Sequence, residues 1–281
     1  MTFEPQELGQ SRADLAETLR THRKRAGWNQ TRLAQRCNMS QTKISNIESG
    51  KITPTLVDVE LILRALEAPP ELIAEVTALA RMANTEWQDN WSLLRRGLDK
   101  RQNNLAGFEK SSTGFRYFLP TMITGLLATP EYVRESIADV PEEQRRKTVA
   151  KKLERQEILY DKSKRFTFIL TEQAVRWPLV PPGALSVQIE HLAALTRLSN
   201  VRIGVIPIGP GVIPGPLNVF TVYDNRVATV ETQTGIMVFR DSRDVTAYIE
   251  EFSRYEEHAL FGEAAREKLG EWSMIFTRQR E

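Results

Sequence analysis

Apolar residues recur at helical spacing in five short stretches of the first 84 residues. In the first stretch, Leu15, Leu19 and Ala26 fall on one side of a helix that Gly27 ends, because glycine readily adopts the left-handed conformation after a helix. The first predicted helix begins at Arg12, and the second spans Gln30–Arg36. The third lies between Ser40 and Gly50, the fourth follows Pro54, and the fifth follows Pro69-Pro70. Residues 1–10 lack such a pattern and are predicted to be a loose arm. Five helices of this size can close one small core.

The helix between Ser40 and Gly50 has the most informative pattern. At about 100° per residue, Ile44 and Ile47 form a narrow apolar edge, while uncharged amides and hydroxyls cover the opposite side. The Ser40 hydroxyl can cap the first turn, and Gly50 can end the helix. Side-chain amides pair well with adenine in the major groove. Taken alone, the helix could equally be a surface helix with a polar outer face.

From Arg165 the apolar period changes from helix to strand. Alternating or continuous apolar runs predict five strands, which are FTFILTE, VRIGVIPI, LNVFTVYD, VATVETQ and IMVFRD. The last three are separated by turn residues, Asn225 and Gly235, and are predicted to be antiparallel. Helices are predicted over 141–161, between the first two strands, and twice at the end of the chain. The inner side of the helix over 141–161 is predicted to carry Val149, Leu153, Gln156 and Tyr160.

These patterns divide the chain into three parts. We predict an all-α five-helix domain at 1–84, a partly helical linker at 85–114, and a larger α+β domain at 115–281 with an antiparallel or mixed sheet. A length of 281 residues fits two domains. In the linker, Trp87, Trp91, Leu94 and Leu98 can lie on one side of a helix, and such a stripe is more often a packing surface than a ligand site.

Charge distribution adds one observation. Residues 1–51 carry nine Lys/Arg and five Asp/Glu, a balance of +4, whereas residues 52–84 carry two and five, a balance of −3. Positive charge therefore gathers around the polar helix, as nucleic-acid binding requires, although a moderate basic bias also occurs without it. No apolar run is long enough for a membrane span, and the N-terminus lacks a signal-peptide layout. We expect a cytoplasmic protein. The single cysteine, Cys37, excludes an internal disulfide and a cysteine-cluster metal site.

Two short helices joined by a few residues have the geometry of a helix-turn-helix, in which the second helix lies in the major groove. The motif combines Gln30, Leu33-Ala34 and Ser40 with the run I-x-x-I-E-x-G-K that ends at Lys51. It resembles the repressor-type helix-turn-helix of phage repressors and the XRE family, over about 60 residues from Leu15.

This resemblance implies contacts with double-stranded DNA. The matching positions are Gln30, Gln41, Thr42, Lys43, Ser45, Asn46, Ser49 and Lys51. Gln41, Thr42 and Asn46 correspond to base-reading positions, and Ser49 and Lys51 to phosphate contacts. Lys43 and Ser45 lie beside the base-reading positions.

Four residues of the motif have further roles implied by the same resemblance. Gln30 would begin the second helix and contact the DNA backbone and a base from its end. Arg23 and Glu48 would form a buried ion pair that ties the first helix to the third. Cys37 stands where the family has a small apolar residue, so it belongs to the core.

The second half of the chain carries another resemblance. Its landmarks are FLPTMITGLLATPEYVRESI, KLERQEIL, FILTEQAVRWPL, HLAALTRLSNVRIGVIP, GPLNVFTVYD and VATVETQTGIMVFRD. They resemble the uncharacterised domain that follows repressor-type helix-turn-helix domains in antitoxin-like regulators of high-GC Gram-positive bacteria. That resemblance implies a small partner protein encoded nearby. Thr124 and Ala128 depart from the family pattern of Pro and Gln.

Motifs for catalysis are missing from the sequence. No nucleophile elbow, zincin or phosphate-loop pattern occurs, and the three histidines have no ligand-spaced partners. We therefore expect no enzyme, no cofactor and no metal. Glu172 and Glu231 at strand ends are candidates for binding a polar ligand, although strand-end carboxylates are more often only hydrated.

Two hypotheses for the function follow. The first is a sequence-specific DNA-binding transcriptional regulator whose C-terminal domain forms a homodimer and senses a small protein or ligand. The alternative is an antitoxin-like interaction protein that sequesters a small partner, with DNA binding for autoregulation. Apolar residues beyond the needs of one sheet face are predicted to meet helices or a second copy: Phe168, Val219, Phe220, Val222, Val238 and Phe239.

Overall fold

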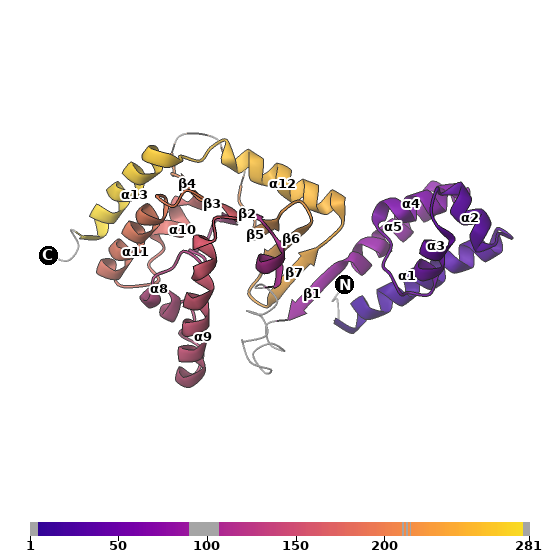
Figure 1. Ribbon diagram of the computed structural model, residues 1–281, viewed down its shortest axis with the longest axis horizontal. Helices are drawn as coiled ribbons and strands as arrows, with labels where there is room; N and C mark the ends of the chain where they lie inside the picture. Colours follow the sequence, from indigo (N-terminus) through magenta and orange to yellow (C-terminus); the bar gives the residue numbers. More distant parts are fainter. Residues whose placement is uncertain (1–4, 90–106, 210, 212, 214, 278–281) are drawn as a thin grey trace. The chain divides into compact units, whose positions relative to one another are not determined.

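The computed structural model describes residues 5–89, 107–209, 211, 213 and 215–277 (Figure 1). The chain divides into two compact units. The first comprises Met1–Gln88 with Met237–Ser242, and the second comprises Asp89–Ile236 with Arg243–Glu281.

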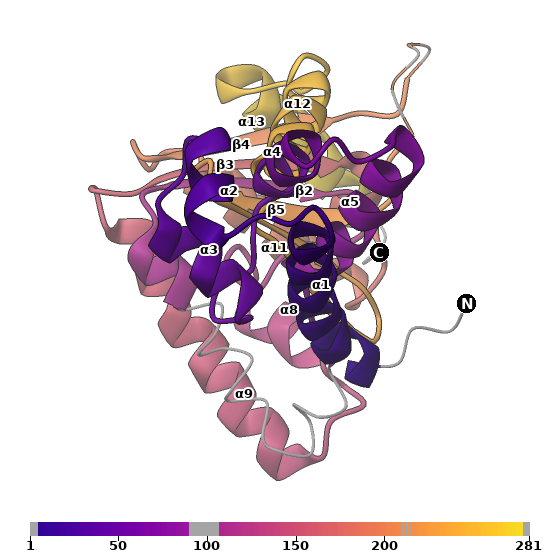
Figure 2. The same cartoon turned by 90° about the vertical axis from the view of Figure 1, so that its right-hand side faces the viewer.

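The first unit contains the five helices that the sequence predicts. They are α1 (Pro5–Arg25), α2 (Gln30–Arg36), α3 (Gln41–Glu48), α4 (Leu56–Ala65) and α5 (Pro70–Asn84), followed by strand β1 (Thr85–Asp89). Figure 2 shows these helices from a second side. Their apolar faces share one core that includes Leu15, Leu33, Ile44 and Leu63.

The ends of these helices follow local signals. Asn29 Oδ1 accepts a hydrogen bond from Arg32 N at 2.8 Å, which caps α2. Gly27 and Gly50 have φ angles of 71° and 70°, the left-handed conformation predicted for them. One boundary was predicted wrongly, because α1 begins at Pro5, so residues 5–10 of the predicted loose arm are helical. Proline is well accommodated in the first turn of a helix, which accounts for this start.

The second unit is built on a mixed sheet with the strand order β6-β5-β2-β3-β4, and β7, whose residues 237–239 belong to the first unit, stands next to β6 in that order. The strands are β2 (Gly114–Leu119), β3 (Arg165–Thr171), β4 (Val201–Ile206), β5 (Val219–Tyr223), β6 (Val227–Glu231) and β7 (Gly235–Phe239). The helices are α8 (Pro130–Glu135), α9 (Glu142–Glu154), the 3₁₀ helix η1 (Arg155–Tyr160), α10 (Glu172–Arg176), α11 (Pro182–Leu195), α12 (Ser242–Glu256) and α13 (Gly262–Thr277).

Strand β2 joins two differently built halves of this sheet. On one side, β2, β3 and β4 run parallel, with Tyr117 opposite Phe168. On the other side, β5 runs antiparallel to β2, and β6 runs antiparallel to β5. The five predicted strands correspond to β3–β7, and the mixed sheet was one of the two predicted forms. Neither β1 nor β2 was predicted from the sequence.

The two faces of the sheet have different coverings. On one face, the Phe118 ring stacks on Tyr255 of α12 with 3.9 Å between ring centroids, and Phe220 meets Phe252 of the same helix. Side chains alternate along a strand, so Tyr117 and its partner Thr221 point to the other face. That face also carries the stacked rings of Tyr117 and Phe168.

One further prediction is wrong in part, and another can be compared with the structure only over part of its residues. The predicted helix over 141–161 becomes the 3₁₀ helix η1 at Arg155, and Tyr160, predicted to point inward, is 65% exposed. A 3₁₀ helix has about 3.0 residues per turn, which shifts the side chains out of the α-helical phase. In the linker, residues 85–89 and 107–114 are described. The predicted helical stripe is wrong at Trp87, because residues 85–89 form the strand β1, while Trp91, Leu94 and Leu98 lie outside the described residues.

The segment around residue 109 is fixed by buried charges. Glu109 is 1% exposed, and its carboxylate accepts from Arg155 Nε at 2.7 Å and from Tyr117 Oη at 3.3 Å. The Lys164 ammonium donates to the carbonyl oxygens of Glu109 at 2.7 Å and Ser112 at 2.6 Å. This network holds the start of the second unit against η1 and the beginning of β3.

Candidate nucleic-acid interface

Helices α2 and α3 are joined by a short, tightly fixed connection. Asn38 has a left-handed φ of 53°, and Met39 N donates to Ala34 O at 2.9 Å. Ser40 then caps α3, with Lys43 N donating to its Oγ at 3.1 Å. Two helices connected in this way have the geometry of a helix-turn-helix, with α3 in the position of the recognition helix.

Helix α3 presents the polar face that its sequence predicts. Ile44 and Ile47 are completely buried, whereas Gln41 and Thr42 are exposed. The intermediate positions Ser45 and Asn46 are half-buried and belong to the same outer side, together with exposed Ser49 and Lys51 just after the helix. The apolar edge therefore fixes α3 in the core while its amides and hydroxyls face outward.

The amide of Gln41 is held by Gln30 at the start of α2. Gln41 Nε2 donates to Gln30 Oε1 at 2.9 Å, and Gln30 Nε2 donates in turn to Glu48 Oε2 at 2.9 Å. Gln41 takes part in the first of these bonds alone and uses only its NH2 group, so its amide oxygen is left as an acceptor for a base edge. The structure thus gives Gln30 a positioning role toward Gln41, in addition to the contacts implied by the resemblance.

The expected pair of Arg23 and Glu48 lies below these amides. Arg23 Nε and Nη2 donate to the two carboxylate oxygens at 2.5 and 2.7 Å, and Arg23 Nη1 donates to Trp28 O at 2.6 Å. Both side chains are buried, at 8% and 7% exposure. Burial by itself raises the pKa of Glu48, but the hydrogen bonds from Arg23 and Gln30 outweigh it and hold the pKa below its usual value.

Lys43 is engaged within the unit. Its ammonium lies 2.7 Å from Asp58 Oδ1, so Lys43 forms an ion pair with a residue of α4. Asp58 also completes a capping box, because its side chain accepts from Thr55 N while Thr55 Oγ1 accepts from Asp58 N. The sequence analysis did not identify Asp58, although the spacing Thr55-x-x-Asp58 is a recognisable capping signal.

The end of α3 exposes the predicted phosphate-contacting residues. Ser49 Oγ donates to Asn46 O at 3.2 Å, and Ile52 N donates to the same carbonyl at 3.2 Å. These bonds, with the left-handed Gly50, turn the chain sharply so that Lys51 is exposed beside the helix end. A cation at that point suits a phosphate, and a hydroxyl such as that of Ser49 can donate to one.

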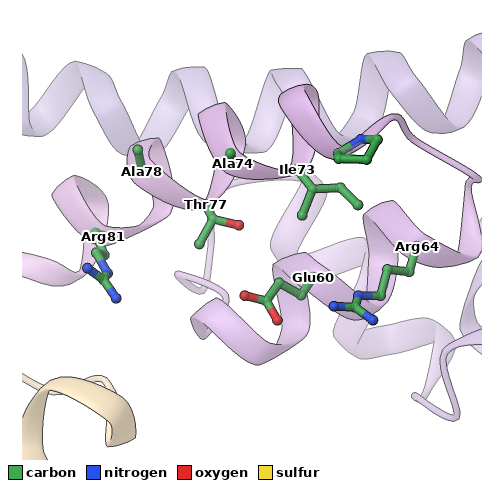
Figure 3. A pocket seen from close by; sticks show the side chains of 8 residues that line it. Glu60, Arg64, Ile73, Ala74, Thr77, Ala78 and Arg81 are labelled. Carbon is green, nitrogen blue, oxygen red and sulfur yellow. The ribbon is translucent and has the colours of Figure 1, made fainter. Parts of the chain in front are cut away.

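A separate hollow of about 560 Å³ lies between α4 and α5 (Figure 3). Glu60 and Arg64 of α4 and Ile73, Thr77 and Arg81 of α5 line it. None of these residues belongs to the predicted DNA-binding set. The polar face of α3 therefore remains the candidate interface of this unit.

The other candidate residues that the structure describes have structural roles. Cys37 is buried in the core, and burial raises the pKa of its thiol. Glu172 is also buried, pairing with Arg176 and accepting from Ile208 N at 2.9 Å, so it serves the loop after β4. In the described part of the chain, no cluster of His, Cys, Asp and Glu side chains could hold a metal ion. None of the described helices has the length and apolar content that a membrane span needs.

Most of the predicted apolar surplus of the sheet is buried within the chain. Phe168, Phe220, Val222 and Val238 are at most 2% exposed. They therefore offer no surface to a second copy, because helices and neighbouring strands already cover them. Val219 and Phe239 are half-buried.

Fold and site together define a helix-turn-helix unit followed by an α+β unit. Residues 14–76 match the model of a helix-turn-helix domain. Residues 102–271, more than half of the chain, match the model described as a domain of unknown function (DUF5753), and the chain belongs to that family. A helix-turn-helix domain indicates a DNA-binding regulator. No curated protein matches the chain.

Solved structures give only distant similarity. Nuc from Salmonella typhimurium, a phospholipase D family member, is 9% identical, with a TM-score of 0.33 over 58% of this chain and 90% of that one. NucT from Helicobacter pylori is 8% identical, with a TM-score of 0.36 over 63% and 97%. TrmBL2, an archaeal chromatin protein, is 10% identical, with a TM-score of 0.34 over 64% and 53%. Scores this low support no argument about fold or function.

Proposed function

We propose that this protein is a sequence-specific, XRE-type transcriptional regulator of the cytoplasm, without enzymatic activity. Helix α3 enters the major groove of double-stranded DNA, where Gln41, Thr42 and Asn46 contact base edges. The observation that carries this proposal is the hydrogen-bonded series Gln41–Gln30–Glu48, which orients an exposed amide on a rigid helix. A helix with only a solvated outer face has no need of such ordering.

Binding should be tested with the full chain and DNA selected from a random library. Gln41→Ala should weaken binding by about 1–3 kcal/mol and relax preference at one base position, while Lys51→Ala should weaken all sequences about equally. Gln173→Ala, at an exposed position of α10, is the matched control and should bind as the native protein does. Unchanged base preference after joint replacement of Gln41, Thr42 and Asn46 by alanine would falsify the assignment.

The second unit is proposed to dimerise the protein and to sense a signal. One helix-turn-helix reads few base pairs, so useful affinity generally needs two half-sites about one helical turn apart. Apolar side chains that the second unit leaves exposed are candidates for the dimer contact, among them Val187 at 54% and Ile208 at 77% exposure. Sedimentation of the full chain should give a dimer, and Val187→Asp or Ile208→Asp should shift it toward monomer.

The antitoxin-like alternative makes a different prediction. If sequestering a small partner protein were the main task, the partner would bind with equal affinity to a protein that cannot bind DNA. Co-purification with the product of a small neighbouring gene, unaffected by the triple alanine variant of α3, would favour that alternative.

A further inference from the structure

A cavity of about 590 Å³ opens on the second unit at one edge of the sheet. Leu119 ends β2, Val219 begins β5, and Glu231 ends β6, where it pairs with Val219. β2 is the strand at which parallel pairing changes to antiparallel pairing. The strand order also reverses at β2, because β3 and β4 follow it on one side and β5 lies on its other side; in open α/β sheets, ligands bind outside the carboxyl ends of the strands where the order reverses. None of the residues that line it belongs to the helix-turn-helix.

The wall of the cavity is held in place before any ligand arrives. The loop after β2 is fixed by Gln156 of η1, whose Nε2 donates to Gly125 O and Ala128 O, each at 2.8 Å. Gln188 of α11 is completely buried; its amide donates to Leu127 O and accepts from Thr129 N. Tyr132 Oη accepts from Ile123 N at 3.2 Å. Two side-chain amides and a phenol thus shape one loop, and a preformed site loses little entropy on binding.

The floor of the cavity is polar. Tyr117 and Thr221 lie opposite each other on β2 and β5 and are 4% and 3% exposed. Burial raises the pKa of Tyr117 well above its usual value, and that of Tyr132 is also raised, so both phenols stay neutral. The Tyr117 hydroxyl already donates to buried Glu109 and that of Tyr132 accepts from Ile123 N, so the Thr221 hydroxyl is the group of the floor that suits a small polar ligand.

The walls combine one charge of each sign with aliphatic groups. Glu231 and Lys152 contribute a carboxylate and an ammonium, and the aliphatic part includes Ile123, Met122 at 38% exposure and Leu217 at 95%. A lining whose charges cancel does not suit a polyanion such as a nucleotide, which needs several cations. Both lining tyrosines are buried and offer no open ring face for stacking a sugar.

From these observations we infer that the cavity binds a zwitterion of the amino-acid class, a free amino acid or short peptide with an aliphatic side chain. Its ammonium faces Glu231, its carboxylate faces Lys152 and the Thr221 hydroxyl, and its side chain lies against Met122, Ile123 and Leu217. The inference rests on the proposed function in one respect, because it supplies the ligand that a regulator would sense.

Isothermal titration of the full chain without DNA tests the site directly. The probes are L-leucine and the dipeptide Leu-Leu, with N-acetyl-leucine lacking the ammonium, leucinamide lacking the carboxylate, and ATP as a polyanion. At least one of the two zwitterions should bind, and loss of either charged group should weaken binding about tenfold or more, as expected for a charged hydrogen bond. Absence of binding by both zwitterions, or tighter binding of ATP, would overturn the inference.

Variants locate the binding in this cavity. Glu231→Gln and Lys152→Met should each weaken the zwitterion about tenfold, and Thr221→Val should weaken it less. Matched controls at exposed positions of the same unit, Glu257→Gln and Lys110→Met, should leave it unchanged. Equal affinities of the cavity variants and the controls would place the ligand elsewhere and contradict the inference.

DNA binding is measured separately on the same samples. Failure of the protein to bind any DNA, with the zwitterion still bound, would reject the proposed function and leave the site standing. DNA binding that is intact in a protein to which no zwitterion binds would reject the site alone.

Discussion

Removing the guanidinium of Arg23 should unfold the first unit far more readily than removing an exposed arginine of the same helix. In Arg23→Met, the Glu48 carboxylate stays 7% exposed and keeps only the hydrogen bond from Gln30. Trp28 O also loses its donor at 2.6 Å. A buried charge left without its partner costs about 3–5 kcal/mol.

The matched control is Arg20→Met. Arg20 lies 3.9 Å from Glu17, and both side chains are well exposed, at 47% and 68%. Exposed pairs contribute about 1 kcal/mol or less. The double variant Arg23→Met/Glu48→Met removes both buried charges and should recover most of the lost stability, because an apolar pair of similar volume can replace a buried ion pair.

Hydrogen exchange of the α3 amides in the full chain measures this difference locally. A loss of about 3–5 kcal/mol corresponds to roughly two to four orders of magnitude faster exchange through unfolding of the unit, and the control should change by about one order at most. Similar exchange rates in Arg23→Met and Arg20→Met would refute the reasoning, since the pair would then contribute no more than a surface contact.

Four other predictions follow from the described contacts. The pKa of Glu48 is lowered in the folded state, so the ionised carboxylate stabilises the fold above the ordinary carboxyl pKa of 4.5, and this stabilisation is lost as the pH falls below that value. In Glu48→Gln, the free energy of unfolding should lose this part of its dependence on acidic pH. Lys164→Met should cost about 3 kcal/mol or more in urea unfolding, because buried carbonyls lose an ammonium donor. Gly204→Ala should lower the melting temperature of the second unit, since a Cβ there would lie 2.5 Å from the Phe261 ring. Replacing Lys51 by alanine should make the salt dependence of DNA affinity less steep by about one charge, which anisotropy titrations at several salt concentrations can measure.

The first unit was predictable because its helices are set by local signals. Asn29 and Ser40 cap helices with their own side chains, and Gly27 and Gly50 end helices in a conformation that glycine adopts easily. Such signals act over three or four residues, so they are visible in the sequence. The polar outer face of α3 was predictable for the same reason, since helical periodicity alone separates it from Ile44 and Ile47.

The second unit was less predictable because its central strand depends on distant partners. Gly114–Leu119 follows a polar segment, and it becomes β2 only through pairing with β3 and β5. Strand formation depends more on neighbours than helix formation does. The ion pair of Glu109 and Arg155 could not be predicted for a similar reason, since no local pattern connects a residue before β2 with one in η1.

In the candidate interface, the sequence did not predict the hydrogen bonds and ion pairs that connect the proposed DNA-contacting residues to the rest of the unit. Lys43 was expected beside the base-reading positions, whereas the structure pairs it with Asp58. Gln30 was assigned from the family resemblance, but its hydrogen bonds to Gln41 and Glu48 appear only in three dimensions. Long side chains reach partners on other helices, and spacing along the chain does not specify which ones.

The hydrogen bonds of Gln30 give the buried pair of Arg23 and Glu48 a second role besides stability. A buried pair is weak evidence for stability, because well-packed apolar residues can replace it at little cost. Glu48, however, also accepts the amide of Gln30, which in turn orients Gln41 on the outer face of α3. An apolar replacement of Arg23 and Glu48 would therefore restore the core and still leave Gln30 without its acceptor. Stability and base preference should separate in that double variant: the helix stays folded, while the amide at position 41 loses its fixed orientation.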